Sequence, residues 1–156
     1  MRKALVAGLL FAAAAGSAQE RAPPYWASIA SGQAMMRTGP ARNYPGTWLY
    51  QRRDLPVKVV QTYPNWRKVV DPDGASGWML VTLLSSRRTA MIKPGAPRDV
   101  RVKADASAPV RYRAEAGAIG RIDHCDGQWC HIEFGKRHGY IAQAELAGLD
   151  PGESFD

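Results

Sequence analysis

Residues 65–80 read NWRKVVDPDGASGWML, and this stretch decides the fold of the chain. Two short β-type segments flank Asp71-Pro72-Asp73-Gly74, which is a strong turn signal because proline presets φ and glycine accepts a positive φ. A related stretch, QWCHIEFGKRHGYIA, occupies residues 128–142. Each has a tryptophan just after a turn and a Gly-aromatic pair further on. The chain therefore contains two tandem copies of one small β unit.

Further landmarks repeat outside these stretches. Leu55-Pro56-Val57 precedes the first and Ala118-Ile119-Gly120 precedes the second, while Leu84 and Leu146 follow them at nearly matching intervals. Short strands punctuated by Gly and Pro, without a convincing helix of three turns, are typical of small barrels. The sequence thus predicts an all-β fold of two tandem small barrels.

The repeat also sets the expected domain boundaries. We predict a first module at residues 28–92, a linker at 93–97, a second module at 98–149 and a frayed acidic tail at 150–156. Within the first range, residues 87–92 are expected to form a further strand that joins the modules. The linker is short and contains two prolines, so it should hold the modules in a preferred orientation.

The N-terminus has the features of a secretory signal peptide at residues 1–18. A positive start, Met1-Arg2-Lys3, precedes an apolar run at 4–15 that is too short to span a bilayer, and small residues follow. We place the cleavage after Ala18 and expect a periplasmic or secreted protein with no membrane insertion after signal removal. The alternative is an N-terminal anchor or an ordinary buried helix.

Charge is shared unevenly between the modules. The whole chain has a net charge of +7, with nine basic and three acidic residues between residues 28 and 92, but eight and seven between residues 98 and 149. The first module is therefore the better candidate for an anionic partner, unless its charges only keep the protein soluble. Nucleic acid is a poor partner for an exported chain.

Three motifs of the first copy resemble the bacterial SH3 family, often called SH3b. They are the loop Arg37-Thr38-Gly39-Pro40, the segment Asn65-Trp66-Arg67-Lys68-Val69 and the strand start Gly77-Trp78-Met79. The second copy departs from the pattern, with Lys103-Ala104-Asp105-Ala106 taken as the loop and Tyr140 in place of the last tryptophan. The resemblance implies SH3-like barrels and a targeting or binding role, commonly toward cell-wall peptide or envelope proteins.

The first module also contains the candidate ligand site. Tyr44 and Trp66, beside Arg37 and Arg42, would form an apolar groove with a basic rim. Such a groove suits a peptidoglycan peptide, whose carboxylates the arginines would hold. The alternative is a structural or assembly protein of the cell envelope, in which these aromatics belong to the core. Exposure of Trp66 would favour the groove, and burial would favour the structural role.

The two cysteines lie in His124-Cys125-Asp126-Gly127-Gln128-Trp129-Cys130-His131. In an exported protein, two cysteines that face each other across a hairpin predict a Cys125–Cys130 disulfide. The rival is a metal site formed by these cysteines with His124 and His131. Adjacent residues of a strand point to opposite faces, so the four ligands would not converge, and we predict no metal.

The sequence also argues against catalysis. The first module contains no histidine, and its few acidic residues lie in or near turns. Both cysteines are expected to be oxidised, and the two modules occupy nearly all of the mature length. We therefore predict a non-catalytic protein without a cofactor.

Overall fold

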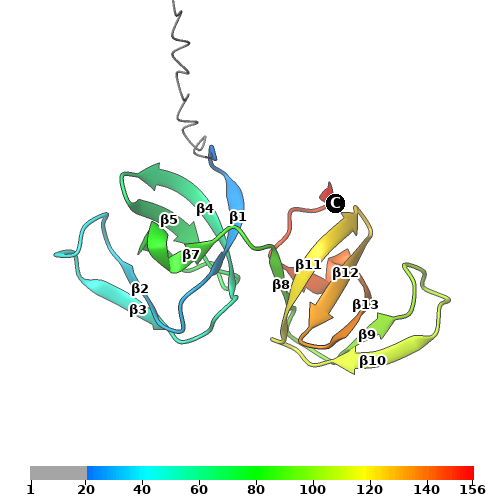
Figure 1. Ribbon diagram of the computed structural model, residues 1–156. Helices are drawn as coiled ribbons and strands as arrows, with labels where there is room; N and C mark the ends of the chain where they lie inside the picture. Colours follow the sequence, from blue (N-terminus) through cyan, green and yellow to red (C-terminus); the bar gives the residue numbers. More distant parts are fainter. Residues whose placement is uncertain (1–20) are drawn as a thin grey trace, which may run out of the picture.

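The computed structural model describes residues 21–156 as two β modules connected by a short segment at residues 86–88 (Figure 1). The predicted signal peptide lies outside the described residues. No helix among the described residues is long and apolar enough to cross a bilayer. The first module consists of β1 (Tyr25–Ile29), β2 (Ala34–Arg37), β3 (Gly46–Tyr50), β4 (Pro56–Tyr63), β5 (Trp66–Val70), β6 (Ser76–Leu80), the single 3₁₀ turn η1 (Val81–Leu83) and β7 (Leu84–Ser85).

The second module repeats this order of elements. Its elements are β8 (Thr89–Ile92), β9 (Arg98–Arg101), β10 (Val110–Ala114), β11 (Ile119–Asp126), β12 (Trp129–Phe134), β13 (Arg137–Ala142), η2 (Gln143–Glu145), β14 (Leu146–Ala147) and β15 (Ser154–Phe155). The first sheet has the strand order β3-β2-β6-β5-β4-β1-β7, and the second has β10-β9-β13-β12-β11-β8-β14. Every strand of the first sheet thus has a counterpart in the second. The predicted all-β fold of two tandem SH3-like modules is confirmed.

The strand β8 corrects the predicted boundary at residue 92. It pairs with β11 and β14 of the second sheet, in the place that β1 holds beside β4 and β7 in the first. All four of its side chains are buried. The first module therefore begins earlier than residue 28, and the second begins with β8. Residues 93–97, predicted to link the modules, instead connect β8 to β9 within the second.

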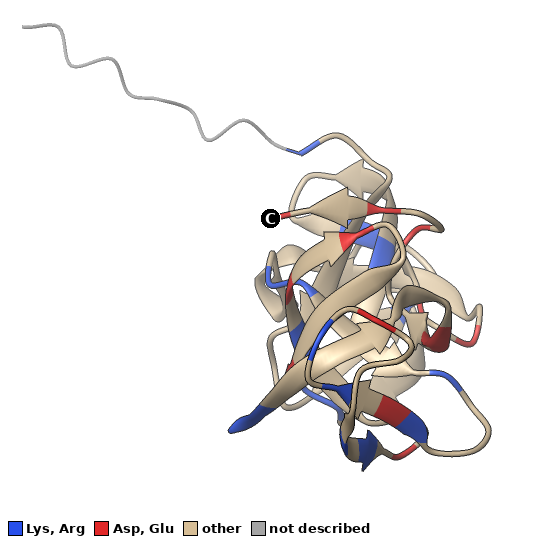
Figure 2. Ribbon diagram, turned by 90° about the vertical axis from the view of Figure 1, so that its right-hand side faces the viewer, with Lys and Arg blue, Asp and Glu red and all other residues tan. Residues whose placement is uncertain are grey.

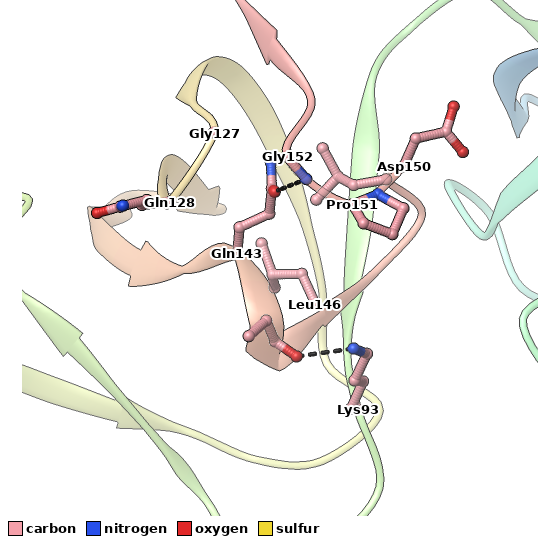
Figure 3. A pocket seen from close by; sticks show the side chains of 10 residues that line it. Lys93, Gly127, Gln128, Gln143, Leu146, Asp150, Pro151 and Gly152 are labelled. Carbon is pink, nitrogen blue, oxygen red and sulfur yellow. Dashed lines mark hydrogen bonds between the residues drawn. The ribbon is translucent and has the colours of Figure 1, made fainter.

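The tail at residues 150–156 is also ordered, contrary to the prediction that it frays. β15 pairs with β11, where Phe155 lies opposite Cys125. The buried side chain of Gln143 holds the tail from the other side, because its carboxamide oxygen accepts from Gly152 N at 2.8 Å (Figure 3). Its Nε2 donates to the carbonyl of Glu153 at 2.7 Å. Pairing with β11 thus orders the tail, which its composition alone predicted to fray.

Apolar contacts join the modules. Met91 of β8 is part of the buried core of the first module, and Ile119 of β11 packs against that core. Gly148 lies against Pro56 so closely that an added Cβ would be 2.8 Å from the Cβ of Pro56. The hydroxyl of Thr89 donates to the Asp54 carbonyl across the same boundary at 2.7 Å. The preferred orientation therefore rests on packing rather than on a stiff linker.

An ion pair lies beside these contacts. Lys58 Nζ of β4 is 2.6 Å from Asp150 Oδ1, which also accepts from Trp26 Nε1 at 3.3 Å. The hydrogen bond from Lys58 is the main reason that the pKa of Asp150 lies below its usual 3.8, against the desolvation of the carboxyl. Both side chains are partly exposed, at 30% for Lys58 and 50% for Asp150, so water screens the attraction.

We expect Asp150→Asn to lower the free energy of unfolding at pH 7 by about 0.5–1 kcal/mol. A carboxyl whose folded pKa is depressed stabilises the fold above its unfolded pKa, and this contribution is lost as the pH falls through the folded value. The difference between variant and wild type should therefore shrink below about pH 4. Urea titrations at several pH values measure it, with Asp73→Asn in an exposed turn as control. An equal effect of both variants would contradict the role of the ion pair.

Candidate binding site

The end of β2 and the β2–β3 loop hold three of the four residues predicted to form the ligand groove. Arg37, at the end of β2, donates from Nη1 to the Tyr44 carbonyl at 2.8 Å. The Tyr44 ring covers Gly39, where an added Cβ would be 2.5 Å from the ring, and the side chain is 45% exposed. Arg42 is exposed in the same loop. The loop therefore brings Arg37, Arg42 and Tyr44 into one segment.

Trp66, the fourth predicted residue, is not available to a ligand. It begins β5, is only 6% exposed and lies opposite Leu80 of β6. The groove predicted around an exposed Trp66 is therefore wrong. By the criterion set in the sequence analysis, this burial favours a structural role for the first module.

The arginine of the Arg-x-Gly-Pro motif has a counterpart in the second module, Arg101, which the sequence analysis did not identify. Arg37 pairs with Trp78 in the first sheet, as Arg101 pairs with Tyr140 in the second. Arg101 also donates from Nη1 to a carbonyl seven residues further on, that of Ala108, at 2.7 Å. The segment equivalent to the motif is therefore residues 101–104, not 103–106. In both modules the arginine holds its loop in place.

An open cleft of about 570 Å³ lies in the second module, at the position where a groove was predicted for the first. Trp129 occupies the position of Trp66 but is only half buried. The residue opposite it on β13 is Ala142, where the first module has the larger Leu80. A small residue at that position leaves the face of Trp129 accessible. The lining residues are Ala96, Pro97, Arg98, Asp99, Arg101, Ala106, Arg113, Trp129, Ala142 and Glu145.

Charged side chains form the rim of the Trp129 cleft. Asp99 accepts from Arg101 Nη2 and from Arg113 Nε, each at 3.0 Å, and Arg98 pairs with Glu145. Arg113 is 71% exposed and bonds Asp99 through Nε, which leaves both Nη groups to hold a ligand carboxylate. In the first module, Met35 stands at the position equivalent to Asp99, and Leu49 stands at the position equivalent to Arg113.

The polar surface of the second module contains both signs of charge. Figure 2 turns this module toward the viewer and shows Lys and Arg interspersed with Asp and Glu. The Trp129 cleft follows the same rule, with three arginines and two carboxylates. It therefore suits a ligand that carries both carboxylate and amino groups better than a simple polyanion.

A second cleft, of about 540 Å³, lies beside the tail (Figure 3). Its polar groups are already bonded to one another. Lys93 Nζ donates to the Ala144 carbonyl at 2.7 Å, and Gln143 uses both carboxamide atoms to hold the tail. The Trp129 cleft is similar in size and also has paired rim charges, but it is lined by an aromatic ring and by arginines, which the second cleft does not have, so we consider it the better ligand site.

The cysteine hairpin has the predicted structure. Cys125 and Cys130 are bonded to each other across β11 and β12, with their Cα atoms 4.1 Å apart, and both are fully buried. Sulfur atoms in a disulfide are not metal ligands, which removes the four-residue metal set considered from the sequence. The same cross-strand position in the first module is held by Thr62 and the buried Arg67.

Comparison with known proteins identifies the family. The bacterial SH3 domain family model matches residues 30–86 and 90–148, one match per module. This chain therefore belongs to the bacterial SH3 domain family. No curated protein sequence matches it.

Two solved structures from Trichomonas vaginalis are similar to the chain over part of their length. The structure of NlpC2 shares 13% identity at a TM-score of 0.34, covering 80% of this chain and 48% of that one. The structure of NlpC1 shares 13% identity at a TM-score of 0.33, covering 83% of this chain and 47% of that one. The chain thus spans about half the length of either, and nothing about its function follows from these scores.

Proposed function

We propose that this chain is a non-catalytic binding protein of the cell envelope, and that its Trp129 cleft binds a peptidoglycan peptide. The observation that carries the proposal is the half-buried Trp129, which lines an open cleft together with three arginines. The sequence analysis placed this surface in the first module. The burial of Trp66 and the larger Leu80 opposite it favour the second module instead.

The chemistry of the cleft supports a short peptide as ligand. The indole face of Trp129 offers stacking area for apolar parts of a chain, and the Nη groups of Arg113 offer a planar fork for a carboxylate. Asp99 and Glu145 provide acceptors for an amino group. Peptidoglycan peptides present free carboxylates and amino groups on a short backbone, so they match both halves of this rim.

The disulfide supports a location outside the cytoplasm. Structural disulfides persist in oxidising compartments and are rare where thiols are kept reduced. Cys125 and Cys130 are buried and bonded to each other, which leaves no free thiol in the chain. A periplasmic or secreted protein, released by removal of the leader at residues 1–18, is consistent with this chemistry.

The proposal is tested by sedimentation of the mature protein with insoluble peptidoglycan at low and moderate salt. We expect saturable binding that Trp129→Ala weakens by about 30-fold, because buried tryptophans dominate such contacts. Arg113→Glu should weaken it by about tenfold, and more strongly at low salt, because salt screens exposed charges. The Arg113 variant changes an exposed side chain and keeps the fold.

Trp48→Ala is the matched control, because Trp48 is 63% exposed on β3 of the first module and lies outside the cleft. Its binding should equal that of the wild type. Tyr44→Ala tests the loop that the sequence analysis favoured and should also bind normally. Binding that is lost in the Tyr44 variant but kept in the Trp129 variant would move the site back to the first module.

A second candidate function is assembly with another envelope protein through the first module. β3 is the last strand of its sheet, and it exposes Trp48 and Leu49 at 63% and 44%. An exposed apolar edge strand is a surface on which another chain can pair. Absence of any binding to peptidoglycan, together with a cross-linked envelope partner that Trp48→Ala abolishes, would favour this function.

A further inference from the structure

A third cleft, of about 410 Å³, lies in the second module, and we call it the basic cleft because cations but no carboxylates line it. It shares no lining residue with the Trp129 cleft, which contains both signs of charge. One wall comes from β10, and the other comes from the β12–β13 turn and the start of β13. The lining residues are Arg111, Tyr112, Lys136, Arg137 and His138.

The strand pairing explains why the sheet opens at this place. β13 pairs with β9 at a single position, where Tyr140 lies opposite Arg101. Arg137 and His138 come before that position, so they have partners on β12 but none on β9. On β10, Arg111 is the extra residue of a β-bulge, a feature that re-aims side chains. The cleft therefore lies beyond the end of β9, between β10 and β13.

Contacts across the cleft hold its cations in place. The guanidinium carbon of Arg137 lies over the ring of Tyr112, 5.6 Å from the ring centroid. Arg111 Nη1 is 3.4 Å from His138 Nε2 on the opposite wall, and because an arginine only donates, this ring nitrogen accepts. Lys136 belongs to the two-residue turn between β12 and β13, which is the tightest common hairpin connection. The positive groups thus converge from both walls.

The positive charge of the basic cleft is not neutralised within the protein. Arg111, Lys136 and Arg137 form no ion pair with any residue of the described chain. Burial raises the pKa of Tyr112 above its usual 10.0, although the positive charges of Arg111 and Arg137 act to lower it. The phenol therefore stays neutral at pH 7 and offers no counter-charge. Three cations are left to bind an anion from outside.

The neighbouring carboxylates of this sheet lie beside a different histidine. His138 Nδ1 is 3.2 Å from His131 Nε2, and His131 Nδ1 is 2.8 Å from Asp123 Oδ1. Glu133 belongs to the same group as Asp123 and His131. Neither carboxylate lines the basic cleft. They interact with His131 rather than with the arginines.

The fold itself does not require these cations. In the first module, Thr47 stands at the position equivalent to Arg111, and Ser76 stands at the position equivalent to His138. The turn equivalent to the one with Lys136 is residues 71–74, which contain two aspartates and no cation. Like charges held close together repel, so the basic cleft opposes folding of the free module. Its presence in one module alone indicates a ligand rather than a structural need.

We propose that the basic cleft binds a phosphate monoester group. Such a group carries a charge of about −1.5 to −2 near pH 7 and presents three acceptor oxygens. Guanidinium forks match the geometry of a phosphate, and a lysine adds a compact charge. Arg111 approaches from β10, while Lys136 and Arg137 approach from the turn, so donors reach different oxygens. This inference does not rest on the peptide proposed for the Trp129 cleft.

The phosphate could belong to a soluble ester or to a lipid headgroup, and two measurements on the mature protein distinguish these sources. The first is titration with glycerol 3-phosphate, followed by ¹⁵N NMR of the arginine Nε–H groups. The second is sedimentation with phosphatidylcholine vesicles prepared with and without phosphatidic acid. We expect saturable shifts at Arg111 and Arg137. Binding only to vesicles that contain phosphatidic acid would assign the site to a lipid headgroup. No response in either measurement would overturn the proposal.

Substitutions then test the individual donors. Arg111→Gln and Arg137→Gln should each weaken binding by about tenfold, because each removes a charge-assisted hydrogen bond. Added salt should weaken binding by the wild type, because it screens exposed charges. Without ligand, Arg111→Gln should unfold at the same temperature as the wild type or higher, since a repulsion is removed. A variant that has merely lost structure would unfold at a lower temperature.

Arg121→Gln and succinate provide the matched controls. Arg121 is exposed on β11 of the same module and does not line the basic cleft, so its variant loses the same charge elsewhere. Binding of glycerol 3-phosphate by this variant should equal that of the wild type. Succinate carries two negative charges on separate planar carboxylates, and it should bind severalfold more weakly. Equal losses in the Arg121 and Arg137 variants, or equal affinity for succinate, would contradict a phosphate site in this cleft.

Discussion

Replacement of Cys125 and Cys130 together by alanine should lower the free energy of unfolding of the second module by about 3–4 kcal/mol. The crosslink spans five residues, and closing so short a loop in the unfolded chain accounts for about 2 kcal/mol. The remainder comes from the loss of two fully buried sulfur atoms, which leaves small cavities in the core. A module with so thin a core has little stability to spare.

Native-state hydrogen exchange measures this loss one module at a time. Amide exchange in β11 and β12 should accelerate in the double variant by about the factor that 3–4 kcal/mol implies, while β4 and β5 should change much less. The wild type treated with a reductant provides the control. Its amide exchange in β11 and β12 should also accelerate, but by less than in the variant, because the sulfur atoms still fill the core. Exchange in β11 and β12 that stays within twofold of the wild type would contradict the structural role of the disulfide.

The hairpins were predictable from the sequence because their signals are local. The two β-type segments predicted on either side of the turn at residues 71–74 are the strands Trp66–Val70 and Ser76–Leu80, and the Cys125–Cys130 bond was correctly predicted. In each case a turn sequence fixes the register, and the register then decides which side chains face each other. No distant part of the chain is needed for that inference.

The boundary between the modules was wrong because strand partnership is not local. Residues 89–92 read as a strand from composition, and they form one. Nothing in that short apolar run indicates which of two sheets it joins. Its counterpart in the first sheet is β1, at residues 25–29, and this equivalence can be recognised only when the strand orders of both sheets are known. The tail was misjudged for the same reason, since its partner is β11.

The ligand groove illustrates a different limit. Both modules have a tryptophan at the start of the same strand, and the sequence singled out Trp66 because its surroundings resemble the family motifs more closely. The exposure of each tryptophan depends on the residue opposite it on the neighbouring strand, which is Leu80 for Trp66 and Ala142 for Trp129. That pairing requires the register of β6 and β13. The contact between His131 and His138 was missed similarly, because it depends on the pairing of β12 with β13.

The contact between the modules makes Gly148 the most sensitive single position at their boundary. An added Cβ would lie 2.8 Å from the Cβ of Pro56 and 2.9 Å from the Thr89 carbonyl, neither of which can move without shifting a strand. The residue also has a φ of +106°, which L side chains rarely adopt. We expect Gly148→Ala to lower the free energy of unfolding by about 3 kcal/mol, with strain and overpacking each contributing.

Gly74→Ala separates these two causes. Gly74 has a φ of +89° in the turn before β6, with nothing within 4 Å of an added Cβ, so its variant experiences backbone strain alone. Urea unfolding of both variants should show a loss of about 1 kcal/mol for Gly74→Ala. The Gly148 variant should also accelerate amide exchange around Thr89 and Pro56, because the modules must separate to accept the methyl group. Equal losses in the two variants would mean that the modules are not held by this contact, and that their orientation is free to change.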